Sequence, residues 1–226
     1  VRLRTIRQHR AGDGGGMASL AGCGVTLSKR LFDIVVALIV AAVLLPVGLI
    51  MALVILILDG RPVIYRSERM KTPIQAFMLL KFRSMTVVAT DSGVSGGDKA
   101  ARITRCGAFL RRSRLDELPQ LWNVLRGDIS FVGPRPPLRQ YVDRFPDLYG
   151  EVLKSRPGIT GLATIVYHRH EEWLLTRSRS PEETDAIYAR ACVPRKARLD
   201  LIYQRRRTLC LDIKLMAKTV FRRIPL

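Results

Sequence analysis

The run IVVALIVAAVLLPVGLIMALVILIL, Ile34–Leu58, decides the architecture because it contains no charged side chain. As an α-helix it would be about 38 Å long, which exceeds the ~30 Å hydrocarbon core of a bilayer. A cleaved signal peptide has a shorter apolar core and a small-residue cleavage site, whereas this run continues into DGRPVIYR. The sequence therefore predicts a helix that stays attached and lies in lipid.

The flanks of this run indicate how the helix enters the membrane. Both flanks are basic, with Arg2, Arg4, Arg7, Arg10, Lys29 and Arg30 before the run and Arg61, Arg66, Arg69 and Lys71 after it. Positive charge favours the cytoplasmic side, so we expect both ends there. Pro46, with Gly48 close behind, would kink the helix. We therefore expect a re-entrant helix that enters the membrane and returns; the alternative is one kinked spanning helix with its N-terminus outside.

The composition points to a polyanionic partner. The 226 residues include 38 Lys+Arg against 19 Asp+Glu, a net charge of +19. Such an excess suits nucleic acid, an anionic lipid leaflet or phosphorylated substrates. No nucleic-acid-binding module is recognisable, and the basic residues cluster beside apolar segments, so we expect anionic lipids and phosphates and no nucleic acid.

Cysteine and histidine spacing predicts no metal centre. Cys23, Cys106, Cys192 and Cys210 form no CxxC pair, which argues against a zinc site or a disulfide framework. We expect His168 and His170 to lie on the surface, with a metal-ligand role as the less favoured alternative.

Local patterns predict the elements that follow the membrane helix. Residues 60–70 and 77–85 are typical of two strands or a hairpin. Helical segments are expected over Cys106–Arg112 and Pro119–Leu125, the second stopped by Gly127. The stretch ISFVGPRPPL, residues 129–138, predicts a short extended piece that ends in a rigid turn.

Near the C-terminus, Leu209, Ile213, Met216 and Val220 follow helical spacing while basic residues lie mostly elsewhere. We expect one basic amphipathic helix over Leu199–Arg223 on anionic lipid; a helix packed on the core with a solvated basic face is the alternative.

The predicted fold class is α+β and mainly helical. A re-entrant membrane helix over residues 29–60 precedes a small cytosolic domain over 61–198, which has a short β-hairpin and interfacial amphipathic helices. Residues 199–226 form the surface helix. Residues 1–28 are expected to be a flexible basic extension; Met17 is an alternative start, which would leave residues 1–16 outside the native protein.

The stretch RRSRLDELPQ, residues 111–120, places Asp116 and Glu117 directly behind three arginines. Adjacent helical residues point about 100° apart, so the two acids are poorly placed to share one proton. Pro119 is tolerated in the first turn of a helix, whose free N–H groups attract phosphate. A phosphate site with two separate tasks for the acids is the sharper interpretation; a surface ion-pair cluster is the plain one.

The PRP turn supplies a stiff arginine. Pro134 and Pro136 bracket Arg135 and restrict its backbone, which suits a phosphate-binding side chain. An ordinary surface turn would read the same way. RPGITGLA, residues 156–163, is typical of a tight loop packed against another part of the structure, or of the start of a strand.

A single membrane segment followed by KFRSM (81–85), LDELPQLWNVLRGDISFVGPRP (115–136) and RPGITGLA resembles the bacterial sugar transferase family, the monotopic phosphoglycosyl transferases. The resemblance extends from about Ser28 to the C-terminus. It implies transfer of a sugar 1-phosphate from a nucleotide diphosphate sugar, usually a UDP-sugar, to polyprenyl (undecaprenyl) phosphate, with release of UMP. It also implies a place at the cytoplasmic face of the bacterial inner membrane, at the start of exopolysaccharide, capsule, O-antigen (lipopolysaccharide) or glycoprotein synthesis.

The resemblance also implies residue roles. Asp116 would be the nucleophile that forms a covalent phosphosugar intermediate, and Glu117 would bind Mg²⁺. Substrate-binding roles fall on Lys81, Arg83, Arg111, Pro134, Arg135 and Pro136.

Two departures leave the sugar open: TIVYHRHEEWLL (164–175) replaces an NGRN-type continuation, and Leu45 precedes Pro46 where some relatives have serine. The rival hypothesis is a membrane-attached protein that binds lipid phosphates or nucleotide sugars without turnover. A homo-oligomer is compatible with either.

Overall fold

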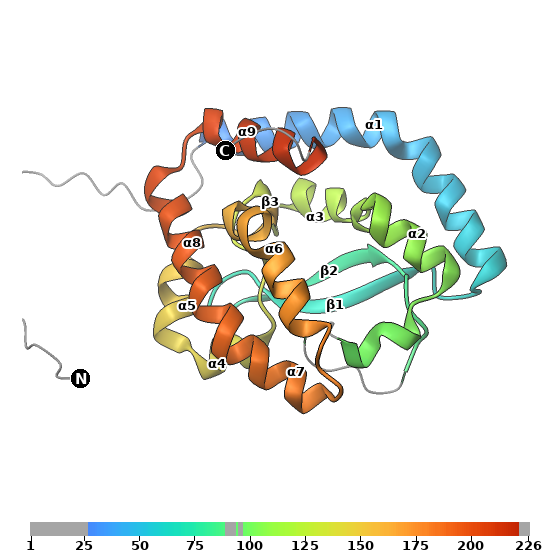
Figure 1. The fold of residues 1–226 in the computed structure, drawn as a ribbon. Coiled ribbons are helices and arrows are strands. Elements are labelled where there is room, and N and C mark those ends of the chain that lie inside the picture. Colours follow the sequence, from blue (N-terminus) through green and yellow to red (C-terminus); the bar gives the residue numbers. More distant parts are fainter. Residues whose placement is uncertain (1–26, 89–93, 95–96, 222–226) are drawn as a thin grey trace, which may run out of the picture.

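The computed structural model describes residues 27–88, 94 and 97–221 (Figure 1). The described part of the protein is mainly helical with two small two-stranded sheets, which confirms the mainly helical α+β class. Almost all of the expected N-terminal extension, Met17 included, lies outside the described residues. Helix α1 (Leu27–Leu58) contains the whole apolar run and has Pro46 inside it. Within the described ranges it is the one helix long and apolar enough to cross a membrane.

The elements after α1 follow the predicted order. Strands β1 (Ile64–Met70) and β2 (Ala76–Phe82) pair antiparallel, which confirms the hairpin. Helix α2 (Arg105–Ser113), the 3₁₀ turn η2 (Leu115–Glu117) and helix α3 (Gln120–Arg126) then place the acidic pair at the mouth of α3. Gly127 ends α3 with a φ of 80°, a left-handed conformation that glycine adopts without strain.

Strand β3 (Ser130–Val132) is the predicted extended piece. It pairs in parallel with β4 (Gly158–Thr160), so RPGITGLA is both a strand entry and a tightly packed loop. The remaining elements are η1 (Gly97–Arg102), α4 (Arg139–Arg144), α5 (Pro146–Val152), α6 (Leu162–Leu175), α7 (Pro181–Ile187), the π-helical turn η3 (Tyr188–Cys192), α8 (Val193–Arg206) and α9 (Leu209–Val220).

The C-terminal tail differs from the prediction of one helix over Leu199–Arg223. The chain leaves the helical path at Arg207, and Thr208 starts a new helix by accepting a hydrogen bond from the Leu211 N–H at 3.1 Å. Helix α8 buries Ala197 and Tyr203 and belongs to the core. Helix α9 instead leaves most of the predicted apolar stripe in the open: Ile213 is 52% and Val220 74% exposed.

Buried ion pairs attach the N-terminal end of α1 to the rest of the folded domain, referred to below as the body of the protein. The Lys29 ammonium lies 2.8 Å from Asp33 Oδ1 and 3.0 Å from Asp212 Oδ2 of α9, and all three side chains are buried. Tyr203 donates a hydrogen bond to Asp212 Oδ1 at 2.6 Å. Arg30 donates hydrogen bonds to the last carbonyls of α3, Val124 and Leu125, at 2.6 Å each. Figure 1 shows α9 running beside this part of α1.

The C-terminal end of α1 also packs against the body of the protein. Ile55 packs with Phe82, Cys106 and Leu110 in one buried cluster. Thr104, at the start of α2, donates a hydrogen bond to Asp59 Oδ2 at 2.8 Å. Between the two ends α1 bends towards the hairpin (Figure 1), and its middle section presents exposed apolar side chains. Both ends of the apolar helix therefore lie against one compact unit.

Candidate active site

The acidic pair is held in the turn between α2 and α3. Arg114 ends α2 in a left-handed conformation with a φ of 62°, which redirects the chain into η2. Asp116 is buried at 6% exposure, and the Glu117 side chain is 12% exposed. The acids thus lie inside the protein rather than on an open surface, which removes the interpretation as a surface ion-pair cluster.

Glu117 is the carboxylate that the cations hold directly. Lys81 Nζ, from β2, lies 3.1 Å from Glu117 Oε1, and Arg135 Nη2, from the turn after β3, lies 3.6 Å from the same oxygen. Burial alone would raise the pKa of Glu117, but Lys81, Arg135 and Arg114 outweigh it and lower the pKa to about 2. Glu117 is therefore ionised at neutral pH.

Asp116 shows the opposite shift. Burial raises its pKa, and the neighbouring Glu117 charge adds to that, while Lys81, Arg111 and Arg114 offset part of it. Within the described ranges no hydrogen bond or ion pair holds the Asp116 carboxylate. Two adjacent acids with opposite pKa shifts are typical of sites that give carboxylates different tasks.

Lys81 lies close to the acids because hydrogen bonds join α3 to β2. The Asn123 side chain is buried; it accepts a hydrogen bond from Leu80 N–H at 3.0 Å and donates one to Met78 O at 2.9 Å. These bonds satisfy backbone groups on the edge of β2 that β1 does not cover. Burial lowers the pKa of Lys81, and the Glu117 carboxylate opposes that shift.

Arg135 is positioned by two interlocked loops. Gly158 N–H donates to Pro134 O at 2.8 Å, and Gly133 N–H donates to Thr160 O at 2.9 Å. A Cβ at Gly133 would lie 2.2 Å from the Arg156 carbonyl oxygen, so the crossing requires glycine there. Pro134 and Pro136 are buried on either side of Arg135, as a rigid turn requires.

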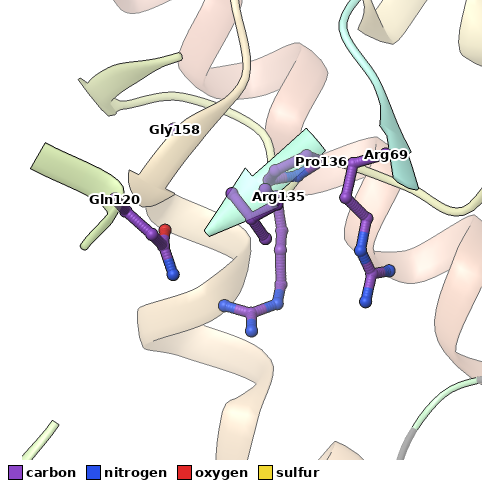
Figure 2. A pocket seen from close by; sticks show the side chains of 6 residues that line it. Arg69, Gln120, Arg135, Pro136 and Gly158 are labelled. Atoms are coloured by element: carbon purple, nitrogen blue, oxygen red, sulfur yellow. The ribbon is translucent and has the colours of Figure 1, made fainter. Parts of the chain in front are cut away.

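A small pocket continues from Arg135. It is lined by Arg69, Leu79, Gln120, Arg135, Pro136 and Gly158. Figure 2 shows the Arg69 and Arg135 guanidinium groups side by side, with the Gln120 amide on the other side of Arg135. The pocket therefore presents hydrogen-bond donors from three separate segments of the chain.

Comparisons with known proteins show the family of the chain. The model of the bacterial sugar transferase family matches residues 25–224, nearly the whole chain. The chain belongs to the bacterial sugar transferase family. It is 36% identical over 86% of its length to the UDP-glucose:undecaprenyl-phosphate glucose-1-phosphate transferase of Klebsiella pneumoniae, of which it covers 39%. An uncharacterized sugar transferase of Bacillus subtilis is 32% identical, with 85% of each chain covered.

The name of a third relative specifies a different sugar. The UDP-N-acetylgalactosamine-undecaprenyl-phosphate N-acetylgalactosaminephosphotransferase of Aeromonas hydrophila is 37% identical over 62% of the chain, which covers 34% of that protein. The chain thus spans well under half the length of the Klebsiella and Aeromonas relatives. Similar identity to a glucose and to an N-acetylgalactosamine enzyme leaves the sugar of this family member open.

The structure brings together most of the predicted site residues. Asp116, Glu117, Lys81 and Arg135 form one group, and Arg111 acts on the Asp116 carboxylate through its charge. Arg83 is not part of that group. Its guanidinium donates hydrogen bonds to the backbone carbonyls of Asp59, Gly60 and Arg61, and within the described residues it makes no ion pair with either acid.

Four residues of the site escaped sequence analysis: Arg69, Arg114, Gln120 and His168. Arg114 and Gln120 lie within the RRSRLDELPQ stretch, so their proximity to the acids was available as a signal. His170 is exposed and His168 lies half-buried at the surface, as predicted, with its Nε2 3.3 Å from Arg114 Nη2. Burial and the Arg114 charge lower its pKa. No sequence pattern around Arg69 indicated a role in the site.

The oxygen donors of the candidate site fit Mg²⁺ bound together with substrate. No group of three or more His, Cys, Asp or Glu residues that could enclose a metal exists within the described ranges. Mg²⁺ is usually held by one or two carboxylates plus substrate phosphates and water rather than by a full protein cage. Glu117, kept ionised by its low pKa, is a carboxylate of the type that would fit this kind of site.

Proposed function

We propose that the chain transfers a sugar 1-phosphate from a UDP-sugar to polyprenyl phosphate, such as undecaprenyl phosphate, and releases UMP. The observation that carries this proposal is the buried pair Asp116 and Glu117, with opposite pKa shifts, beside Lys81 and Arg135. The activities for which the Klebsiella and Aeromonas relatives are named support it.

The proposed chemistry has two displacements. An Asp116 oxygen attacks the β-phosphorus of the UDP-sugar; the bond from that phosphorus to the bridging oxygen breaks, and UMP leaves with that oxygen. A phosphate oxygen of the lipid then attacks the same phosphorus, forms the lipid diphosphate sugar and frees the Asp116 carboxylate. The covalent route divides one transfer between two large substrates into two simpler steps. An unpaired, partly desolvated Asp116 supports the nucleophile role.

The cations have a matching role. A diphosphate repels an attacking carboxylate, so positive groups must neutralise charge and align the reacting atoms. Lys81 and Arg135 lie around Glu117 and are available to the phosphates next to it. Glu117 would hold Mg²⁺, which when bound supplies further charge neutralisation on the diphosphate.

We also propose that α1 is re-entrant and that the active site faces the cytoplasm at the bacterial inner membrane. Both ends of α1 pack on the same body, whereas a spanning helix would place its ends on opposite sides of the bilayer. The exposed apolar face of α9 supports a surface position on anionic lipid. The product would start a lipid-linked glycan: exopolysaccharide, capsule, O-antigen or glycoprotein.

Intact-protein mass tests the proposal. Detergent-purified protein is incubated with Mg²⁺ and a panel of UDP-sugars without lipid phosphate, beside Asp116→Asn and the exposed control Asp143→Asn. We expect a sugar-phosphate mass on the wild type and on Asp143→Asn, and none on Asp116→Asn. The adduct would also identify a usable sugar.

A second arm separates the transferase from the non-catalytic alternative. Lipid phosphate is added and released UMP is measured. UMP release without an adduct would contradict the covalent route alone. No adduct and no UMP release with any donor of the panel would favour a protein that binds lipid phosphates or nucleotide sugars without turnover.

A further inference from the structure

Arg69 is an incompletely paired cation beside the active site. It lies near the end of β1, and its Nε atom is buried with no hydrogen-bonding partner in the part of the chain that the structure describes. The adjacent acid on the strand, Glu68, is engaged elsewhere, with Oε1 2.9 Å from Arg139 Nε. No carboxylate within the described ranges lies within ion-pairing distance of Arg69.

The neighbour of Arg69 is another cation. Arg135 lies beside it in the pocket, and the two guanidinium groups point the same way in Figure 2. Burial, followed by the Arg135 charge, lowers the pKa of Arg69 to about 10; the hydroxyls of Tyr188, Tyr65 and Tyr141 oppose this weakly. Keeping two like charges together with an unmet donor costs free energy in the folded protein. An anion between them would remove that cost.

Gln120 completes the set of donors. Its side chain is only 3% exposed, lines the same pocket, and has no hydrogen-bonding partner within the described residues. The amide can donate two hydrogen bonds and carries no charge. Arg69 from β1, Gln120 from the start of α3 and Arg135 from the PRP turn therefore converge from three segments that are distant in sequence (Figure 2).

The pocket adjoins the acidic pair. Arg135 Nη2 lies 3.6 Å from Glu117 Oε1, so one guanidinium faces both the carboxylate and the pocket. The planar fork of an arginine matches the oxygens of a phosphate, and two arginines with an amide exceed what a single carboxylate of substrate would require. The geometry indicates a phosphate group as the anion.

We infer that Arg69, with Gln120 and beside Arg135, binds a phosphate group of a substrate. That the phosphate belongs to a nucleotide diphosphate or to a lipid phosphate rests on the proposed function. The assignment gives a substrate-binding role to Arg69 and Gln120.

Binding measured without turnover tests the inference. Affinities of inorganic pyrophosphate, UDP and a short-chain polyprenyl phosphate are measured by calorimetry for the wild type, Arg69→Gln and Arg69→Lys. Arg66→Gln is the matched control, an exposed arginine on the same strand. We expect Arg69→Gln to weaken at least one probe by about tenfold or more, Arg69→Lys to recover part of the affinity, and Arg66→Gln to stay within about twofold.

The probes distinguish the two sources of phosphate. Weakened UDP and pyrophosphate binding with unchanged lipid phosphate binding would place the donor in the pocket, and the reverse would place the acceptor there. Unchanged affinity for all three probes would overturn the inference. If Arg69→Gln does not fold, Arg69→Lys decides, because it keeps the charge and loses the fork: wild-type affinity for every probe in that variant would equally overturn the role.

Failure of the proposed function would look different. A wild-type protein that binds these probes through Arg69 but releases no UMP would contradict the transferase activity and leave the phosphate site standing. A wild-type protein that releases UMP while Arg69→Gln binds every probe normally would do the opposite.

Discussion

At the scale of single residues, the site separates two chemically similar acids by their surroundings. Glu117 meets Lys81 and Arg135 directly, so its charge is stabilised. Asp116, one residue earlier, is buried and has only the longer-range influence of Lys81, Arg111 and Arg114. A 3₁₀ turn rotates consecutive side chains about 120° apart, and this rotation is enough to give the neighbours different environments.

Asp116→Asn should abolish activity without loss of stability. The folded-state pKa of Asp116 is raised, so its ionised form at neutral pH destabilises the fold, and asparagine removes that penalty. We expect turnover to fall by about a thousandfold or more and the melting temperature to stay equal or rise. UMP release and thermal denaturation measure the two effects.

The pH profile provides the companion test. If Asp116 is the nucleophile, it must be ionised to attack, and the wild-type rate should decline as pH falls towards its raised pKa, above the ordinary value of 3.8. Glu117 contributes stability that is present above its ordinary pKa of 4.5 and is lost only as pH falls towards 2. A loss of rate at a pH where the protein is still folded is therefore assigned to protonation of Asp116. An Asp116→Asn variant that melts well below the wild type would contradict the raised pKa of Asp116.

At the scale of elements, the membrane helix is joined to the body by a buried polar cluster. Lys29 is 4% exposed and lies between the carboxylates of Asp33 and Asp212, each fully buried. One lysine therefore serves two acids, on α1 and on α9. Such a cluster is weak support for stability as a whole, but removing one partner leaves an uncompensated buried charge.

Lys29→Met should destabilise the protein strongly. Two buried carboxylates would lose their cation, at a cost of about 3–5 kcal/mol in the free energy of unfolding. Lys214→Met, at an exposed lysine of α9, should change that free energy by less than about 0.5 kcal/mol. Denaturation in detergent measures both, and equal stability of the two variants would contradict the anchoring role of Lys29.

At the scale of the whole molecule, the elements with local signals were predictable. The apolar run of α1, the stop at Gly127 and the rigid turn at Arg135 each follow from neighbouring residues. The Lys81–Glu117 pair and the Arg69 pocket depend on segments that only tertiary folding brings together. The break between α8 and α9 was missed because helical spacing continues through Arg207, while the cap at Thr208 decides the boundary.

If α1 is re-entrant, as proposed, both of its flanks lie on the same side of the membrane. Thr5→Cys and Ile74→Cys, each introduced with Cys23 and Cys210 replaced, are treated in spheroplasts with a membrane-impermeant maleimide. Ile74 is exposed on the hairpin turn and reports the body of the protein. We expect neither cysteine to react until the membrane is permeabilised. Reaction at residue 5 in intact spheroplasts would mean that α1 crosses the bilayer.

The attachment of α1 at both ends has a kinetic consequence. In the proposed membrane position, a helix held by Lys29 at one end and by Thr104 at the other would fix the height and tilt of the acidic pair above the lipid. The lipid acceptor would then be encountered by lateral diffusion, in two dimensions, while the nucleotide sugar arrives from solution. In vesicles, the rate would follow the surface density of acceptor, and dilution with inert lipid would slow the enzyme even at constant bulk concentration.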